Sequence, residues 1–283
     1  MSAITLVLST LIFSSVQMND IQKTQPADSG KKIQQTVNIA HRGGAGISAE
    51  NTLGAFKKAV DMKVDWIEID VRQTKDRIPV VIHDALLDRT TSMNGSVINL
   101  TYQAIQQADA GSWFNIFFKG EKVPSLEDVL KTVNAKTKLL VELKENNHTS
   151  PGIEKNVAAL IKKYNAYSWV TVQSFDDLAL ANMHKADSAI TLQKLYVGKL
   201  PLFPVYYDTK LTLRQPKWFE YASGINLNKT FATRRAIRRI HKLNKTVFVW
   251  TVDNPAEMKK MIRRGADGII TNRPDILKRY IVR

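Results

Sequence analysis

The stretch WIEIDV at residues 66–71 indicates most directly how this chain folds. Four of its six positions are apolar, as in a strand that is buried on both faces of a parallel sheet. Similar short runs recur on both sides of it, so we expect a sheet of many short strands. These runs are VNIA (37–40), PVVIHD (79–84), KLLVELK (138–144), WVTVQSF (169–175), ITLQKLY (190–196), GINLN (224–228), TVFVWTV (246–252) and DGIITN (267–272).

Helical patterns lie between most of these runs. One of them begins at Ser125, an N-cap residue that Glu127 and Asp128 follow in the first turn. Strands and helices that alternate over roughly 250 residues are typical of a closed parallel α/β barrel, so we expect a (β/α)8 TIM barrel. The other predicted helices cover residues 51–62, 151–165, 177–186, 232–243 and 255–264.

The predicted barrel is somewhat irregular, because nine strand candidates are one too many for eight strands. The link at residues 72–78 is too short for a helical crossover, which needs about a dozen residues. Either the two runs that it joins form a hairpin, or the barrel is irregular there. Residues 85–124 follow this third strand, and we expect them to form a small cap over the barrel mouth.

Residues 1–35 are predicted to be a signal or anchor segment with a linker, ahead of a barrel domain at residues 36–283. Residues 3–16 are uncharged and fit the apolar core of a secretory signal, although they are fewer than the about 20 residues that span a bilayer. No Lys or Arg precedes them and no A-x-A site follows, so a buried N-terminal helix or strand is the alternative. We expect an exported protein, secreted or associated with the cell envelope, and otherwise a cytoplasmic one.

The composition excludes several classes of protein. The chain has 283 residues, of which 44% are hydrophobic, so it is too apolar to be disordered. It has no cysteine, which excludes a disulfide scaffold, a thiolate metal site and a cysteine nucleophile. Its 41 Lys and Arg against 26 Asp and Glu give a formal charge of +15, which favours contact with a polyanion: nucleic acid, an anionic membrane or cell envelope, or a phosphate-rich substrate.

Acidic residues interrupt strands that are otherwise apolar. Glu68 and Asp70 are two positions apart and therefore share one face of a strand, and Glu142 lies near the end of another. Adjacent carboxylates repel one another unless a cation neutralises them, and oxygen ligands suit a hard ion. We therefore predict that the three bind one divalent cation, Ca²⁺ or Mg²⁺. The alternative is that they pair with the many Lys and Arg residues.

Other polar residues also lie at the carboxyl ends of predicted strands, where barrel enzymes have their active sites. His41 and His83 suit proton transfer near neutral pH, and Arg42 offers a planar fork for a phosphate group. Lys144 could bind phosphate or balance Glu142. The predicted substrate-binding residues are completed by Glu50, Asn51, Gln173 and Trp250, although Glu50 and Asn51 could simply cap a helix and Trp250 could be a core residue.

Together these residues resemble the glycerophosphodiester phosphodiesterase family. The resemblance covers essentially everything after residue 36. It implies a barrel of the phosphodiesterase/phospholipase type, in which the residues that match His41 and His83 are the acid/base pair and those that match Glu68, Asp70 and Glu142 bind the metal. The motifs that carry it are AHRGGAGISAENTLGAF (40–56), DWIEIDVRQTKDRIPVVIHDALLDRTT (65–91), ADAGSWF (108–114), KVPSLEDVL (122–130), LLVELK (139–144), VQSF (172–175), VWTVD (249–253) and GADGIITNRP (265–274).

The expected reaction is metal-assisted hydrolysis of a small glycerophosphodiester to sn-glycerol 3-phosphate and an alcohol. Two alternatives stay open. One is a related enzyme acting on a lysophospholipid, phosphatidylinositol or a teichoic-acid polymer, for which the aromatic residues at 113–118 and in the basic stretch 197–221 provide contacts. The other is a basic polyanion-binding protein without catalysis, based on residues 229–245, which contain seven Lys and Arg and no acid. We expect no nucleic-acid partner and predict no protein partner.

Overall fold

The computed structural model describes residues 35–144, 152–199, 206–207, 211–212 and 218–281. Apart from Gln35, the predicted signal or anchor segment and linker lie outside the described residues, as does much of the stretch 197–221. Among the described residues, no helix is both long enough and apolar enough to cross a membrane.

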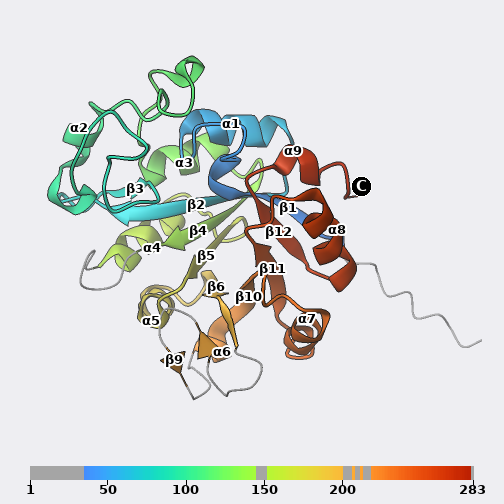
Figure 1. The fold of residues 1–283 in the computed structure, drawn as a ribbon. Helices are drawn as coiled ribbons and strands as arrows, with labels where there is room; N and C mark the ends of the chain where they lie inside the picture. Colours follow the sequence, from blue (N-terminus) through green and yellow to red (C-terminus); the bar gives the residue numbers. More distant parts are fainter. Residues whose placement is uncertain (1–34, 145–151, 200–205, 208–210, 213–217, 282–283) are drawn as a thin grey trace, which may run out of the picture. The chain divides into compact units, whose positions relative to one another are not determined.

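Eight parallel strands form a closed barrel, which confirms the predicted (β/α)8 architecture (Figure 1). Each strand pairs with the next in the ring, and β12 pairs with β1 while β1 also pairs with β2, so the ring has no open edge. In ring order the strands are β1 (Val37–Ala40), β2 (Trp66–Gln73), β4 (Lys138–Leu143), β5 (Val170–Ser174), β6 (Thr191–Tyr196), β10 (Ala222–Asn228), β11 (Thr246–Trp250) and β12 (Gly268–Thr271).

The ninth strand candidate forms a hairpin. β3 (Pro79–Val81) pairs antiparallel with the end of β2, with Val81 opposite Val71 and Pro79 opposite Gln73. β3 therefore extends the sheet beside the ring without joining it. The short link at residues 72–78 is explained, because an antiparallel pair needs no helical crossover.

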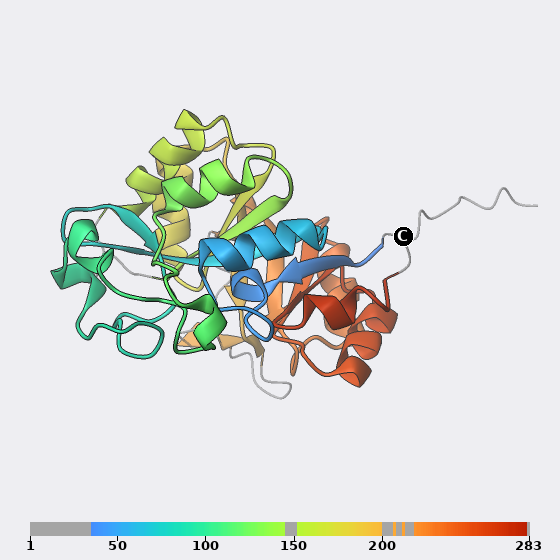
Figure 2. The ribbon, with the colours of Figure 1, turned by 90° about the horizontal axis from the view of Figure 1, so that it is seen from above.

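The helices lie outside the ring of strands (Figures 1 and 2). The predicted N-cap at Ser125 is confirmed, since Ser125 and Asp128 form a reciprocal capping box at α3. At α1 the N-cap is Thr52, whose hydroxyl accepts the backbone N–H of Ala55. The helices are α1 (Leu53–Asp61), α3 (Leu126–Val133), α4 (Ile153–Lys163), α5 (Asp177–Ala186), α6 (Trp218–Tyr221), α7 (Arg234–His241), α8 (Pro255–Arg264) and α9 (Pro274–Leu277).

The alternation of side chains along each strand separates two cores. Ile67 and Ile69 of β2 belong to the large apolar cluster that the helices cover, whereas Glu68 and Asp70 point to the barrel interior. One level of that interior is apolar, with Ile39, Leu140, Phe248 and Ile270 in contact. The carboxyl ends of the strands carry polar side chains instead, and these build the site described below.

Residues 85–124 form an insertion that contains η2 (Val97–Asn99), α2 (Tyr102–Ile105) and η3 (Ile116–Phe118). It has a small core of its own, in which Leu87, Val97 and Ile105 pack against Val80 of β3 and Ile82. A second addition, the short antiparallel sheet of β7 (Gly198–Lys199), β8 (Tyr206–Tyr207) and β9 (Leu211–Thr212), lies between β6 and α6 in the chain.

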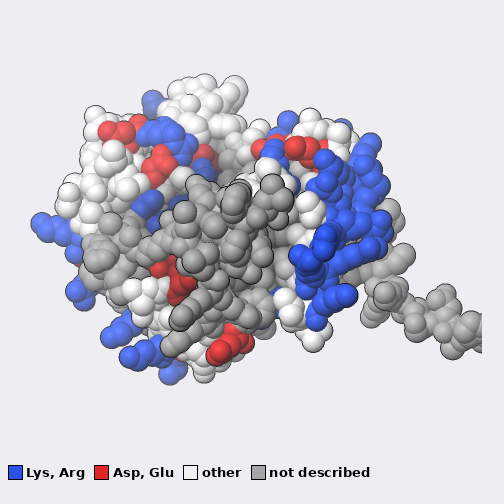
Figure 3. Space-filling model, turned by 60° about the horizontal axis from the view of Figure 1, so that its bottom comes forward, with Lys and Arg blue, Asp and Glu red and all other residues white. Residues whose placement is uncertain are grey.

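The basic excess lies on the outside of the barrel. Lys and Arg gather on the side where α7 and α8 lie (Figure 3). Ile237 of α7 is buried against the strands. The basic side chains of this region are exposed and form no ion pair with the acidic residues that the structure describes: Arg234, Arg235, Arg238, Arg239 and Lys242.

Candidate active site

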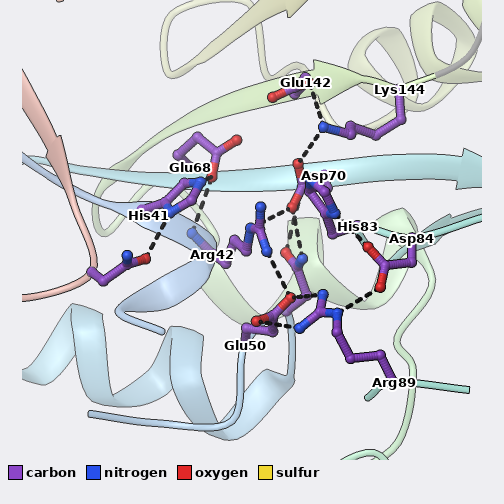
Figure 4. A network of polar contacts seen from close by, with 12 residues as sticks. His41, Arg42, Glu50, Glu68, Asp70, His83, Asp84, Arg89, Glu142 and Lys144 are labelled. Carbon is purple, nitrogen blue, oxygen red and sulfur yellow. Dashed lines mark hydrogen bonds and ion pairs between the residues drawn. The ribbon is translucent and has the colours of Figure 1, made fainter. Parts of the chain in front are cut away.

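The register of two neighbouring strands brings three carboxylates together. Asp70 of β2 lies opposite Glu142 of β4, and Glu68 is two residues before Asp70 on the same face. Each residue offers an oxygen within 4.8 Å of the others, and all three side chains are buried (Figure 4). The sequence therefore predicted the composition and the position of this cluster.

Burial and mutual repulsion make the cluster unfavourable as three bare anions. Burial raises the pKa of Glu68 well above its usual range, and Asp70 and Glu142 raise it further. Burial also raises the pKa of Glu142. Burial opposes ionisation of Asp70 too, but Lys144 and Arg42 outweigh it and lower the pKa of Asp70 to about 2. Ionisation of all three carboxylates together is therefore unfavourable unless a further positive charge is present.

This donor set fits a hard divalent cation. All the atoms on offer are carboxylate oxygens, which Ca²⁺ and Mg²⁺ prefer. One of them, Asp70 Oδ1, is buried and accepts no hydrogen bond from the described residues, although Lys144 Nζ lies 3.5 Å from it. A buried acceptor of this kind is costly unless a cation satisfies it.

Two cationic side chains border the cluster. The Lys144 ammonium donates to Glu142 Oε1 at 2.7 Å. Burial lowers the pKa of Lys144, but Glu142 and Asp70 raise it by more, so the net shift is upward. Arg42 follows β1 with a left-handed backbone, φ 53°. Its backbone N–H donates to Glu68 Oε2 at 3.0 Å, and its guanidinium donates to Glu50 and lies 3.1 Å from Asp70 Oδ2. Both cations are therefore held at the edge of the cluster, where a guanidinium and an ammonium group can bind a phosphate group.

His41 is held by a neutral amide. Its Nδ1 lies 2.7 Å from Asn272 Oδ1, and the Asn272 amide group in turn donates to Asp253 Oδ2 at 2.8 Å. Because the amide oxygen can only accept, Nδ1 carries the proton and Nε2 is left with its lone pair, 3.9 Å from Glu68 Oε2. Burial lowers the pKa of His41 to about 4, with a further contribution from Arg42, so the ring is neutral at neutral pH.

His83 is held by a carboxylate instead. Its Nδ1 donates to Asp84 Oδ1 at 2.6 Å, and Arg89 donates to the other oxygen of Asp84 at 2.6 Å. Burial raises the pKa of Asp84, but its hydrogen bonds to Arg89 and His83 lower it to about 2, so Asp84 is ionised. Burial lowers the pKa of His83 from its usual value, whereas Asp70 and the hydrogen bond to Asp84 raise it.

The remaining predicted residues lie around these groups at different distances from the cluster. Asn51, at φ 59°, donates to Asp70 Oδ2 at 2.9 Å, and Glu50 accepts from both Arg42 and Arg89. The side chain of Gln173, on β5 beyond β4 in the ring, donates to Glu68 Oε1 at 3.5 Å.

Trp250 is the predicted residue least connected to the cluster. Its indole N–H donates to the backbone oxygen of Asn226, and its ring meets Phe175 edge-to-face at 5.3 Å. It also packs beside the apolar core of the barrel interior. Its role in substrate binding stays a prediction.

Four residues that contact the site are not among the predicted site residues, and one of them is Asp84, the partner of His83. Asn272 and Asp253 orient His41, and Arg89 links Asp84 to Glu50. Asn272 directly follows β12, so the same criterion of a polar residue at a strand end would have selected it. Arg89 lies in the insertion and carries no signal of this kind.

The chain is similar to a known protein family, to individual relatives and to a solved structure. Residues 41–276 match the profile of the glycerophosphoryl diester phosphodiesterase family. A relative from Bacillus subtilis is 39% identical over 245 residues, which are 84% of this chain and 95% of that protein. The glycerophosphodiester phosphodiesterase of Caldanaerobacter subterraneus subsp. tengcongensis is 34% identical over 86% of this chain and 96% of its own length. The crystal structure of an Agrobacterium tumefaciens glycerophosphodiester phosphodiesterase superposes with a TM-score of 0.71 at 26% identity, over 86% of this chain and 98% of that one.

Proposed function

The chain belongs to the glycerophosphoryl diester phosphodiesterase family, and on that premise we propose that it hydrolyses glycerophosphodiesters to sn-glycerol 3-phosphate and an alcohol with a divalent cation and two histidines. One observation carries the proposal: three buried carboxylates and two histidines with different partners meet at one end of the barrel. This combination supplies both charge neutralisation and proton transfer for cleavage of a phosphodiester.

Glu68, Asp70 and Glu142 would hold the cation. When bound, a divalent cation neutralises phosphoryl oxygens and makes an attacking hydroxyl more acidic. With the charge of the three carboxylates neutralised in this way, the positive charges of Arg42 and Lys144 would become available to the substrate. Arg42 and Lys144, which contact Asp70 from two sides, would hold the phosphate group of the substrate next to the cluster.

The partners of the two histidines favour different roles in the reaction. His41 is neutral and keeps a free Nε2 lone pair beside Glu68, so we assign it the general base that takes the proton of the attacking hydroxyl. His83 donates to the ionised Asp84, which stabilises an imidazolium, so we assign it the acid. As the phosphorus–oxygen bond to the alcohol breaks, His83 would give its proton to the departing oxygen.

The attacking hydroxyl can come from either of two sources. If it is water, sn-glycerol 3-phosphate forms directly. If it is the glycerol hydroxyl next to the phosphate, a cyclic phosphate forms first, and water then opens it with the two histidines in exchanged roles. The same residues serve both routes.

A panel of soluble phosphodiesters tests the proposal. We expect glycerophosphocholine and glycerophosphoethanolamine to release sn-glycerol 3-phosphate, while diesters without a glycerol group are poor substrates. Release of phosphocholine, or turnover that His41→Ala and His83→Ala leave unchanged, would contradict it.

The alternative of a polyanion-binding protein without catalysis is disfavoured, because the basic residues of α7 lie outside the barrel and the family is one of hydrolases.

A further inference from the structure

The insertion carries a rigid apolar tip that nothing in the proposed reaction uses. Seven large apolar side chains are exposed among the described residues, and three of them lie within five positions of one another. Trp113 is 39% exposed, Ile116 is 64% exposed and Phe117 is 91% exposed. We call these three residues the insertion tip. Exposed apolar side chains that cluster in this way mark a contact site more often than isolated ones do.

Contacts within the insertion hold the tip in place. The Asp109 carboxylate accepts the backbone N–H groups of Gly111, Ser112 and Gly120, and Asn115 Oδ1 accepts the N–H of Phe117 at 3.0 Å. Beneath the tip, Phe114 and Phe118 are half-buried and meet edge-to-face at 5.4 Å. The turn therefore directs two aromatic rings inward and Ile116 and Phe117 outward, so their exposure is built into the turn.

The insertion tip borders the active site through one side chain. The Arg89 guanidinium lies 5.8 Å from the centre of the Trp113 ring, within the range of a cation–π contact. The same guanidinium donates to Glu50 at 2.7 Å and to Asp84 at 2.6 Å. A surface that receives the tip would therefore lie beside the histidine and phosphate-binding groups.

The size and shape of the tip favour one kind of partner. Three side chains offer far less than the about 800 Å² that each partner contributes to a stable protein dimer. Phe117 is exposed over nearly all of its surface, so a single acyl chain would cover little of it. A lipid interface, by contrast, surrounds protruding apolar side chains, and tryptophan suits its headgroup region. The formal charge of +15 favours the general approach of the chain to an anionic bilayer.

We propose that the insertion tip inserts into the interface of a phospholipid bilayer and so places the catalytic site at the level of the lipid headgroups. Docking itself does not depend on the reaction. Only its consequence, access to lipid-borne phosphodiesters in addition to soluble ones, rests on the proposed function.

The absence of cysteine permits a test at a single position. In the full chain, Ile116→Cys carries an environment-sensitive dye, and Leu178→Cys, at a half-exposed leucine of α5, carries the same dye as the control. On addition of phosphatidylcholine–phosphatidylglycerol vesicles, we expect the dye at position 116 to show a blue shift and protection from an aqueous quencher, and the dye at 178 to show neither. An unshifted dye at 116, or equal shifts at both positions, would overturn the proposal.

Two further variants distinguish the contribution of the insertion tip to vesicle binding from that of the rest of the chain. Phe117→Ser should weaken vesicle binding by at least about tenfold, since it removes a large buried apolar surface from the docked state. Leu178→Ser should leave binding unchanged. If Arg235→Glu/Arg239→Glu abolishes binding and Phe117→Ser does not, the basic face of α7 is the contact and the proposal is wrong.

Activity measurements distinguish this proposal from the proposed function. Phe117→Ser should keep the parental kcat/KM on soluble glycerophosphocholine and lose at least about tenfold on lysophosphatidylcholine in micelles or vesicles. Equal rates of the variant and the parent on the lipid substrate would overturn the stated consequence of docking. If the parent hydrolyses neither diester, the proposed function fails, while the dye measurements still decide whether the tip docks.

Discussion

His41 Nδ1 and the side-chain oxygen of Asn272 lie 2.7 Å apart, across the pair of strands β1 and β12. This contact selects the tautomer in which Nε2 is free to accept a proton. Asn272→Ala removes it without changing any residue of the acidic cluster. We expect kcat/KM on glycerophosphocholine to fall about 100-fold, within the usual range for general base catalysis, with a thermal midpoint close to that of the parent.

Asn272→Asp serves as the matched variant. A carboxylate at this position still accepts from Nδ1 but stabilises the imidazolium, so the pKa of His41 rises from its value of about 4. The acid limb of the pH–rate profile should therefore move to higher pH. Parental kcat/KM in Asn272→Ala, or an unmoved acid limb in Asn272→Asp, would show that Asn272 has only a structural role.

His83 and Asp84 predict the behaviour on the alkaline side of the profile. As the acid, His83 must be protonated, so kcat/KM should fall as pH rises through its pKa, which burial lowers below the usual value. Asp84→Asn removes a charge that stabilises the imidazolium, so the alkaline limb should move to lower pH. If Asp84→Asn leaves the alkaline limb in place, the assignment of His83 as the general acid is contradicted.

Glu68 predicts how stability depends on pH in the presence of a chelator. Because burial and Asp70 raise its folded-state pKa, stability is fully present below the unfolded value near 4.5 and is lost as pH rises through the folded pKa. Glu68→Gln removes this loss, so at alkaline pH with chelator it should unfold at the same temperature as the parent or a higher one. A clearly lower midpoint in Glu68→Gln would contradict the repulsion argued for this cluster.

The parent protein and its Glu68→Gln variant also test cation binding without an activity assay. Ca²⁺ or Mg²⁺ at a concentration 100 times its Kd should stabilise the parent by about 2.7 kcal/mol and leave Glu68→Gln unaffected. The measurement is the thermal midpoint with chelator and after addition of each cation. Equal stabilisation of the two proteins would place the cation elsewhere.

Gly111 predicts the stability of the insertion. A Cβ atom there would clash with the backbone oxygen of Phe118, so Gly111→Ala should destabilise the fold by about 1–3 kcal/mol in urea unfolding. Gly120→Ala is the control, because nothing lies within 4 Å of its Cβ and only the strain of its φ of +95° remains. If Gly111→Ala loses no more stability than Gly120→Ala, the turn adapts more easily than its packing indicates.

Most of the fold could be predicted because local patterns and long-range geometry agree. The apolar runs became strands at nearly the expected bounds, and Ser125 and Thr52 begin the helices that follow them. The hairpin of β2 and β3 could be named only as one of two possibilities. The length of a link excludes a helix but does not say whether the second strand enters the ring.

The acidic residues of the site could be predicted because they interrupt strands that are otherwise apolar. The residues that contact the site from distant segments of the chain could not be predicted in this way. Glu68 and Asp70 interrupt an apolar strand, which is unusual and therefore visible in the sequence. Arg89 looks like an ordinary surface residue there, and only the packing of the insertion places it between Glu50 and Asp84. Asn272 was detectable by its position after β12, but its partner His41 is 231 positions away.

The most direct measurement of the central claim is the rate of sn-glycerol 3-phosphate release from glycerophosphocholine by protein stripped with chelator and then given Mg²⁺ or Ca²⁺. The account predicts that the stripped parent is inactive, that at least one cation restores its rate, and that Glu68→Gln stays inactive with either. A stripped parent that keeps its full rate, or a Glu68→Gln variant that recovers like the parent, would contradict cation-dependent hydrolysis at this cluster.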